Sequence, residues 1–300
     1  MKDKAHAPLK GVLWMVVTGI LFVFVTALVK LNGTRIPAVQ SAFLRYALGL
    51  VLLFPMWQHF RQTRFDRPMM LAFTIRGVTH SLGVALWFFA MARIPIADVT
   101  AMNYMTPVYV TLGAALFLGE TLALRRVLAV MAALIGAMII LRPGFREVST
   151  GHLAMIVTAL FFACSYLLAK HLSARVNAAT VVVMLSLFVP VGLAPWAFAV
   201  WVPPTLNEVV ILFAVACFAT AGHYTMTLAF AAAPVTVTQP VTFLQLIWAV
   251  SLGIVFFGEP FDPWVVAGGT LILASVSFMS WREAVSKKRA LTPPVHAPKV

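Results

Sequence analysis

Two halves of this chain carry the same sequence pattern, and this repeat constrains the fold more than any other feature. Residues 11–30 align without a gap on residues 151–170. A second ungapped register follows at an offset of 139 instead of 140 residues, and it matches Glu120 with Glu259. The first register has eight identical pairs: Gly11/Gly151, Leu13/Leu153, Met15/Met155, Val17/Val157, Thr18/Thr158, Phe22/Phe162, Leu28/Leu168 and Lys30/Lys170. Shared apolar composition does not produce two such registers, so the chain is expected to be two copies of one unit.

The composition places both copies in a membrane. Hydrophobic residues make up 62% of the chain and charged residues 10%, which is not typical of a soluble domain. Stretches of roughly 20 apolar residues are long enough to span a bilayer as helices. The expected spans are 10–30, 37–57, 69–92, 97–118, 123–142, 151–171, 178–200, 207–231, 235–257 and 263–282. The fold class is therefore an all-α membrane protein with ten transmembrane helices.

The ten spans divide evenly between the copies. Residues 1–148 hold five spans, residues 149–285 hold the other five, and residues 286–300 form a basic tail that is expected to be disordered and cytoplasmic. Because five is odd, the second copy must enter the membrane from the opposite side. Inverted repeats of this kind are typical of secondary transporters, whose site lies at mid-depth between the halves. A duplicated structural bundle without transport is the alternative.

The net charge of +13 is explained by orientation in the membrane. Fifteen Lys and Arg residues fall in segments on the same side of the membrane as the N-terminus, and five fall in segments on the opposite side. This asymmetry predicts that both termini lie in the cytoplasm. Anionic membrane lipids are expected contacts, but nucleic acid is not, because no basic face interleaved with exposed aromatic residues lies outside the spans.

The sequence lacks the motifs of several other classes of protein. There is no GxxxxGK[ST] loop and no HExxH sequence, so the sequence predicts neither an ATP-driven pump nor a zinc hydrolase. Cys164 and Cys217 both fall inside spans, so no disulfide framework is expected. We expect no enzyme activity, no cofactor and no bound metal.

A polar stripe on spans 4 and 9 is the first candidate substrate site. Residues three apart share one helical face, and each stripe is polar at mid-span and aromatic one turn later. The stripes are Thr100, Asn103, Thr106 and Tyr109 in span 4, and Gln239, Thr242, Gln245 and Trp248 in span 9. They are expected to line a cavity, although polar side chains can also hold neighbouring helices together. Pro107 is expected to kink span 4 as a hinge.

Histidines and arginines add further candidates. His80 and His223 lie at mid-depth and could bind a carboxylate or carry a proton, or each could be a neutral histidine bonded to a neighbouring helix. Trp87 shares the face of His80, and Tyr224 and Thr227 lie beside His223. Arg45 is assigned a structural role, whereas Arg76 either reaches the interface or contacts an anion.

Acidic residues are expected only at the span ends. Asp98, Glu120, Glu208, Glu259 and Asp262 all lie there. Proton coupling commonly uses an intramembrane carboxylate, so any coupling would have to run through His80 or His223. Uncoupled facilitation and exchange remain open.

These features together resemble the EamA branch of the drug/metabolite transporter superfamily. The resemblance rests on two five-span copies, the sequence AFLRYALG around Arg45, and LGE and FGE at residues 118–120 and 257–259. Within the superfamily, the chain looks most similar to the YddG-type exporters of aromatic amino acids. That resemblance implies a protein of the bacterial inner membrane, and efflux of phenylalanine, tyrosine, tryptophan and related amphipathic compounds through a central cavity.

The candidate residues suit such a cargo. The ring would pack on Trp87, Tyr104, Tyr109 and Trp248, and the zwitterionic head would bond Asn103, Thr106, Gln245, His80 and His223. A monomer is expected, because one chain holds both halves of the site. Exporters of threonine-like amino acids, purines or cationic drugs, and a membrane scaffold, are the alternatives.

Overall fold

The protein is almost entirely helical in the part of the chain that the structure describes. This computed structural model describes residues 8–56, 60–118, 124–145, 147–173, 175–176, 178–232, 241 and 243–291. No β-strand occurs in these ranges. The elements are α1 (Pro8–Asn32), α2 (Ala38–Gly49), η1 (Leu50–Met56), α4 (Arg67–Met91), α5 (Ile96–Asn103), α6 (Thr106–Leu118), α7 (Leu124–Leu141), α8 (Thr150–Ser173), α9 (Ala178–Ala199), α10 (Leu206–Ala232), α12 (Phe243–Phe257) and α13 (Pro263–Leu291).

The helices confirm the all-α membrane fold. Six of the described helices are long and apolar enough to cross a membrane, and three shorter apolar helices lie at 38–54, 127–141 and 244–257. Span 2 is α2 continued by the 3₁₀ helix η1. Span 4 is divided into α5 and α6. Most of the first third of span 9 lies outside the described residues.

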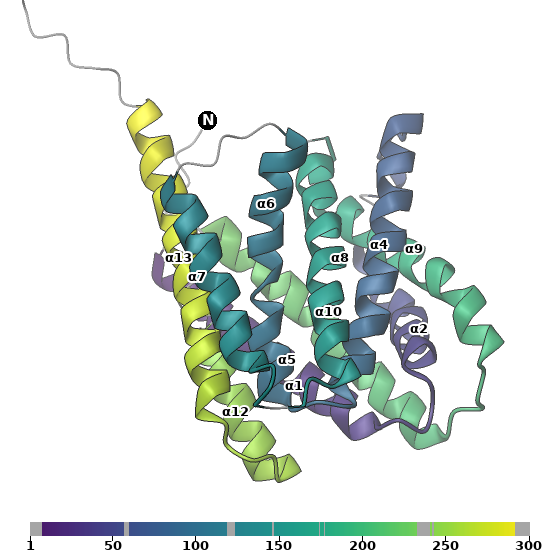
Figure 1. Cartoon of the computed structure of the whole chain (residues 1–300). Helices are drawn as coiled ribbons and strands as arrows, with labels where there is room; N and C mark the ends of the chain where they lie inside the picture. Colours follow the sequence, from purple (N-terminus) through teal and green to yellow (C-terminus); the bar gives the residue numbers. More distant parts are fainter. Residues whose placement is uncertain are drawn as a thin grey trace, which may run out of the picture.

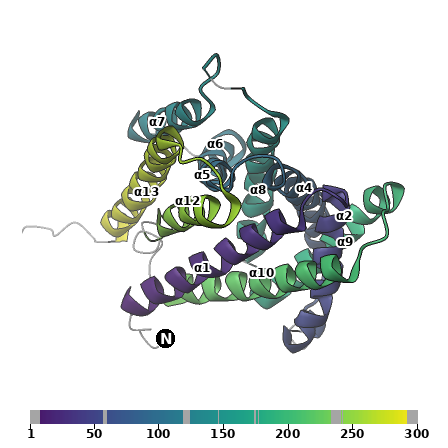
Figure 2. The same cartoon turned by 90° about the horizontal axis from the view of Figure 1, so that it is seen from below.

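The two copies pack against each other with internal symmetry. α1 packs along α10, and the equivalent α8 packs along α4; Figure 2 shows α1 and α10 side by side. A Cβ built on Gly83 of α4 would lie 2.7 Å from the Phe162 ring of α8, and one on Gly222 of α10 would lie 3.3 Å from the Phe22 ring of α1. Since these glycines and phenylalanines are repeat equivalents, the same contact between the two copies occurs twice, with the roles of the copies exchanged.

α7 and α13, the last helix of each copy, form a third contact of this kind. They lie side by side at one edge of the bundle (Figure 1). A Cβ on Gly136 would lie 2.7 Å from the Gly268 carbonyl oxygen, and one on Gly268 would lie 2.5 Å from the Gly136 carbonyl oxygen. Small residues let backbones approach closely in membranes, where van der Waals packing holds helices together.

The repeats run in opposite directions. Ion pairs join the end of α1 to the end of α12, the end of α7 to the start of α13, and the start of α5 to the start of α8. We call this side of the bundle, where α5, α8, α10 and α13 begin, the ion-pair end. α8 therefore begins the second repeat at the ion-pair end, whereas α1 begins the first repeat at the opposite end.

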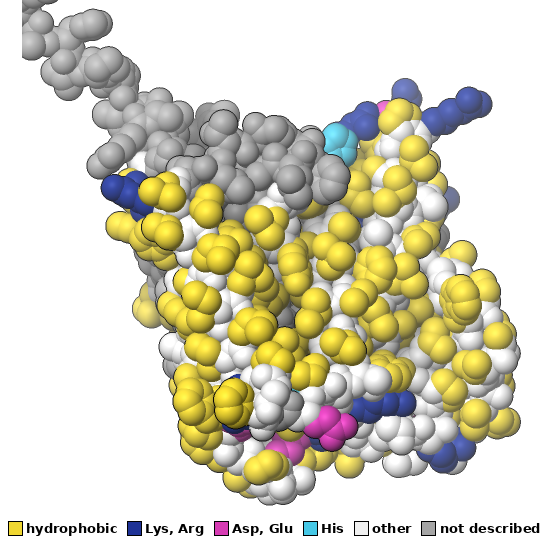
Figure 3. All heavy atoms as spheres, in the orientation of Figure 1, with side chains coloured by type: hydrophobic (Ala, Val, Ile, Leu, Met, Phe, Trp, Pro, Cys, Tyr) yellow, Lys and Arg dark blue, Asp and Glu magenta, His cyan; other side chains and the backbone are white. Residues whose placement is uncertain are grey.

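Charge and apolar surface follow the same axis. Figure 3 shows hydrophobic side chains across the middle of one face, basic residues at the upper end and mixed acids and bases at the lower, ion-pair end. At the opposite end, Asp66 caps α4 by accepting the Met69 N–H at 2.8 Å, and it also pairs with Arg175. The Met69 N–H and then the Arg175 guanidinium hold the pKa of Asp66 below its usual value.

Candidate functional site

The division of span 4 leaves two buried polar atoms without partners. Asn103 ends α5 and Thr106 begins α6. The Asn103 Oδ1 and Thr106 Oγ1 atoms are buried and form no hydrogen bond. Such atoms cost roughly 1–3 kcal/mol each when they stay unpaired. This break therefore presents unused hydrogen-bonding groups inside the bundle.

Pro107 lies in the first turn of α6, where a proline is tolerated. The expectation of a mid-helix kink at this residue is thus replaced by a complete break two residues earlier. Pro107 has no N–H to bond the Asn103 carbonyl, so the chain turns more tightly: the Tyr104 N–H donates to Ala101 at 3.2 Å and the Met105 N–H to Met102 at 3.0 Å. Tyr104 lies in the break itself, between α5 and α6.

His80 is the centre of a buried hydrogen-bonded cluster. Its Nε2 lies 3.0 Å from the Tyr46 hydroxyl of α2, and its Nδ1 lies 3.1 Å from the Ser165 Oγ of α8. Its ring packs on Phe162 with centroids 5.0 Å apart. Both ring nitrogens thus have protein partners, as in the interpretation of a histidine bonded to neighbouring helices.

His223 lies in the equivalent helix of the second copy, α10, and meets an equivalent ring. Its ring contacts Phe22 edge-on, with centroids 5.2 Å apart. Phe22 and Phe162 are repeat equivalents, although His80 and His223 are not. Each histidine thus contacts the equivalent phenylalanine of the opposite copy. The sequence offset alone does not show this.

Both intramembrane arginines are buried. Arg76 is 6% exposed and donates Nη1 to the Val181 carbonyl at 2.9 Å, while its Nε has no partner. Arg45 is 9% exposed and lies over the Tyr46 ring at 3.9 Å. Within the described ranges, neither forms an ion pair with a carboxylate. Arg76 is therefore buried within the bundle, and its unused Nε can donate to an anionic group.

The remaining candidates divide into packed and surface side chains. Trp87, Tyr109 and Gln245 are half-buried. Trp248 is also half-buried and its ring lies against Gly19 of α1. Tyr224 is 54% exposed and does not join the buried set. Thr242 and Gln239 lie outside the described residues, as does the side chain of Thr227.

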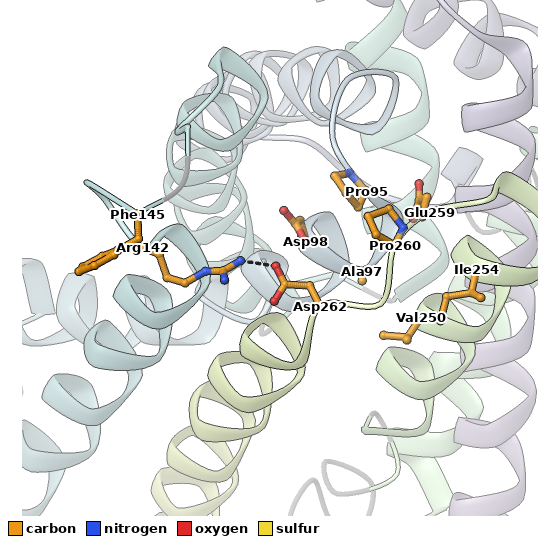
Figure 4. A pocket seen from close by; sticks show the side chains of 10 residues that line it. All are labelled: Pro95, Ala97, Asp98, Arg142, Phe145, Val250, Ile254, Glu259, Pro260 and Asp262. Atoms are coloured by element: carbon orange, nitrogen blue, oxygen red, sulfur yellow. Dashed lines mark hydrogen bonds and ion pairs between the residues drawn. The ribbon is translucent and has the colours of Figure 1, made fainter.

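A cavity of about 310 Å³ lies at the ion-pair end (Figure 4). Its polar lining comes from Asp98 of α5, Arg142 after α7, and Glu259 and Asp262 between α12 and α13. Arg142 pairs with Asp262, and Glu259 pairs with Lys30 and accepts the Ile96 N–H. These contacts all join the first repeat to the second.

Asp98 and His152 are the residues that sequence reasoning missed at this end. They lie 2.8 Å apart and are 2% and 3% exposed. The sequence shows Asp98 only as one of the acids at the span ends, and it gives no signal at His152. Tyr46 and Ser165 were missed likewise, since a lone hydroxyl in an apolar run carries no periodic signal.

Comparison with known proteins identifies the family. The sequence model that describes the EamA-like transporter family matches residues 9–142 of this chain and, a second time, residues 149–281. The chain belongs to this family. The two matches also fall on the two repeats. This EamA protein is thus a multi-pass membrane transporter.

Named relatives carry different cargoes. The protein is 29% identical over 275 residues to the pseudopaline exporter CntI of Pseudomonas aeruginosa, covering 90% of this chain and 95% of the relative. It is 32% identical over 280 residues to the riboflavin transporter of Rhizobium johnstonii, covering 91% of each. It is 20% identical over 286 residues to the S-adenosylmethionine uptake transporter of Rickettsia prowazekii, covering 95% and 97%.

A solved crystal structure shares the fold. The TM-score is 0.61 at 16% sequence identity, over 94% of this chain and 99% of that one. None of the relatives named above is an aromatic amino-acid exporter, so the comparisons establish the family and the transporter class but leave the YddG-type assignment as a prediction. The named relatives are transporters, not enzymes, which agrees with the expected absence of catalysis.

Proposed function

We propose that this EamA protein exports aromatic amino acids and similar small amphipathic metabolites by alternating access. The observation that carries the proposal is the break between α5 and α6, where Asn103 Oδ1 and Thr106 Oγ1 are buried and unpartnered. In carriers, broken helices at mid-depth supply backbone and side-chain groups to the substrate. A bound amino-acid head group would provide the missing donors.

The other candidate residues suit a ring joined to a carboxylate. Tyr104, Tyr109, Trp87 and Trp248 supply half-buried aromatic surface, on which a substrate ring gains roughly 0.5–1.5 kcal/mol per favourable contact. The free Nε of Arg76 can bond a carboxylate. This contact is the anion-binding alternative that the sequence leaves open for Arg76.

The proposed orientation follows from charge. The ion-pair end is proposed to face outward and both termini to face the cytoplasm of a bacterial cell, with the protein acting as a monomer in the inner membrane. The excess of Lys and Arg in segments at the opposite end supports this orientation.

The test is uptake of labelled phenylalanine by proteoliposomes that contain the purified protein. Saturable uptake that unlabelled tryptophan and tyrosine inhibit would support the proposed cargo. Uptake no greater than in protein-free liposomes, with the protein shown to be folded, would remove it.

A flat heteroaromatic metabolite such as riboflavin is the second candidate. The 32% identity to a riboflavin transporter over 91% of both chains favours it. Labelled riboflavin in the same liposomes separates the two cargoes. Uptake of riboflavin that excess phenylalanine does not inhibit would favour the second candidate.

Arg76 offers a direct test of carboxylate binding. Charge-assisted hydrogen bonds contribute about 1.5–3 kcal/mol, so Arg76→Gln should raise the KM for phenylalanine about tenfold or more. Phenylethylamine, which has the ring but no carboxylate, should inhibit the variant and the wild type equally. A KM that stays unchanged would exclude Arg76 from the site.

A further inference from the structure

Two buried arginines carry positive charge that no described acid balances. Arg45 is 9% exposed and Arg76 is 6% exposed, and a guanidinium keeps its charge in proteins. The sequence has no Asp or Glu in the middle of an expected span. At the helix ends, each of these described acids pairs with another base: Asp66, Asp98, Glu208, Glu259 and Asp262.

Both arginines also keep unused hydrogen-bond donors. Arg76 donates Nη1 to the Val181 carbonyl oxygen at 2.9 Å, and its buried Nε has no partner. Arg45 lies 3.9 Å over the Tyr46 ring and forms no hydrogen bond with any residue that the structure describes. Since a guanidinium has five N–H groups, each side chain can still bind an acidic group.

A line of contacts joins the two arginines. Arg76 and His80 are four residues apart on α4, so they share one face of the helix. The His80 Nε2 lies 3.0 Å from the Tyr46 hydroxyl, and the Tyr46 ring lies under Arg45. The charges of both arginines act on the imidazoles of His80 and His223. The two guanidiniums therefore belong to one buried cluster.

This cluster lies at the depth where a carrier binds its cargo. Arg45 is seven residues from the start of α2, which begins at the ion-pair end, and Arg76 is nine residues from the start of α4, which begins at the opposite end. At 1.5 Å per residue these positions are roughly 10 and 14 Å from the two ends. Substrate sites of transporters with inverted repeats lie near this mid-depth.

Charge balance decides which ligand suits the cluster. The carboxylate of an amino acid can bind Arg76, but its ammonium group adds a positive charge close to Arg45. A ligand with two acidic groups balances both guanidiniums instead. Because a buried charge is costly unless it is paired and hydrogen-bonded, the second ligand should bind more tightly.

We propose that Arg76 and Arg45 bind two acidic groups of one substrate, so that the preferred cargo is an amphipathic dianion. The inference rests on the proposed transport site and narrows its cargo. The apolar part of the dianion packs on the aromatic side chains of that site. Arg45, for which the sequence favours a structural role, becomes a binding residue.

The test compares three ligands that share one skeleton. Phenylpropionate has the ring and one carboxylate, phenylalanine adds an ammonium group, and benzylmalonate adds a second carboxylate at the same carbon. Each is titrated into the purified protein in detergent and chloride-free buffer at about pH 7.5, where the carboxyl groups are ionised. A ligand that binds the folded protein raises its melting temperature. We expect benzylmalonate to act at concentrations about tenfold or more below the other two, the effect of one charge-assisted hydrogen bond.

Variants assign this preference to Arg45. Arg45→Gln should reduce the preference for benzylmalonate over phenylpropionate about tenfold or more, and Arg45→Lys, which keeps the charge, should retain part of it. Arg76→Gln should weaken the binding of all three ligands. Arg67→Gln removes an exposed arginine from the same helix as Arg76, so it is the matched control and should keep the wild-type preference.

The wild-type protein alone can overturn the inference. Benzylmalonate that stabilises it no better than phenylpropionate does so, because a single acidic group then suffices. A full preference for benzylmalonate in Arg45→Gln would also overturn it. Uptake of labelled phenylalanine tests the proposed function separately. Tight binding of benzylmalonate without phenylalanine uptake removes phenylalanine as the cargo and supports the dianion site, whereas phenylalanine uptake that benzylmalonate does not inhibit removes the dianion site and supports the proposed function.

Discussion

At the scale of single residues, two equivalent glycines differ in how closely a neighbouring helix approaches them. Gly83 and Gly222 occupy the same place in the repeat and each faces a phenylalanine, but an added Cβ would lie 2.7 Å from Phe162 in one case and 3.3 Å from Phe22 in the other. A contact of 2.7 Å forces α4 and α8 apart, whereas one of 3.3 Å needs a shift of a few tenths of an ångström. The contact between α4 and α8 is therefore tighter at this point than the equivalent contact between α1 and α10.

This difference predicts unequal effects of alanine. Overpacking costs about 1–3 kcal/mol, while replacing a helical glycine returns up to about 1 kcal/mol of helix propensity. We expect Gly83→Ala to lower the melting temperature in detergent clearly and Gly222→Ala to leave it nearly unchanged. Equal effects of the two substitutions would contradict the packing difference.

The hydrogen-bonded histidine gives a second prediction at this scale. Tyr46→Phe removes the hydroxyl that lies 3.0 Å from His80 Nε2. Hydrogen bonds between membrane helices contribute about 0.6 kcal/mol on average and up to about 1.7, so we expect a loss of that size. A double-mutant cycle with Ser165→Ala measures how far the two hydrogen bonds depend on each other, because both hydroxyls bond the same imidazole. Strict additivity of the two losses would show that the cluster does not act as a unit.

At the scale of elements, the broken span is the main departure from the sequence-based expectation. Its apolar length predicted one helix over 97–118 with a kink at Pro107. The structure has two helices, because Pro107 has no N–H to donate to the Asn103 carbonyl. The N–H groups of Tyr104 and Met105 donate instead to the carbonyls three residues earlier. Hydropathy detects the span but not the loss of a single hydrogen bond within it.

Restoring that bond should make the element more rigid. In Pro107→Ala, the alanine N–H can donate to the Asn103 carbonyl and join α5 to α6. We expect a higher melting temperature and slower phenylalanine exchange. Pro195→Ala, at an exposed proline inside α9, is the control and should not slow exchange. Faster exchange in Pro107→Ala would show that the break is not needed for transport.

At the scale of the whole molecule, the ion pairs between the repeats are concentrated at one end, among the residues that the structure describes. Four ion pairs join the repeats at the ion-pair end, and one, Asp66 with Arg175, joins them at the opposite end among the residues described. Glu259 binds Lys30 and the Ile96 N–H at once. This arrangement stabilises a state that is closed at the ion-pair end.

Weakening this end should open it. Glu259→Gln removes the charge that attracts Lys30, so the population with an open ion-pair end should grow. Labelling of Ala97→Cys, which lines the cavity, by a membrane-impermeant maleimide reports this opening in a background with Cys164 and Cys217 replaced by serine. Labelling should be faster with Glu259→Gln and unchanged with Asp66→Asn. A labelling rate that stays the same with Glu259→Gln would show that the ion pair between Glu259 and Lys30 does not hold the repeats together.

The sequence by itself determined the repeat, the membrane environment, the ten spans and the transporter family, because apolar length and an ungapped repeat are properties of the linear chain. It also indicated Asn103 and Thr106, whose polar character in an apolar run is visible without coordinates. Only the tertiary structure brought Asp98 to His152 and each histidine to an equivalent phenylalanine. These contacts join residues of different repeats, so they depend on how the two copies cross, and no local pattern in the sequence specifies that crossing.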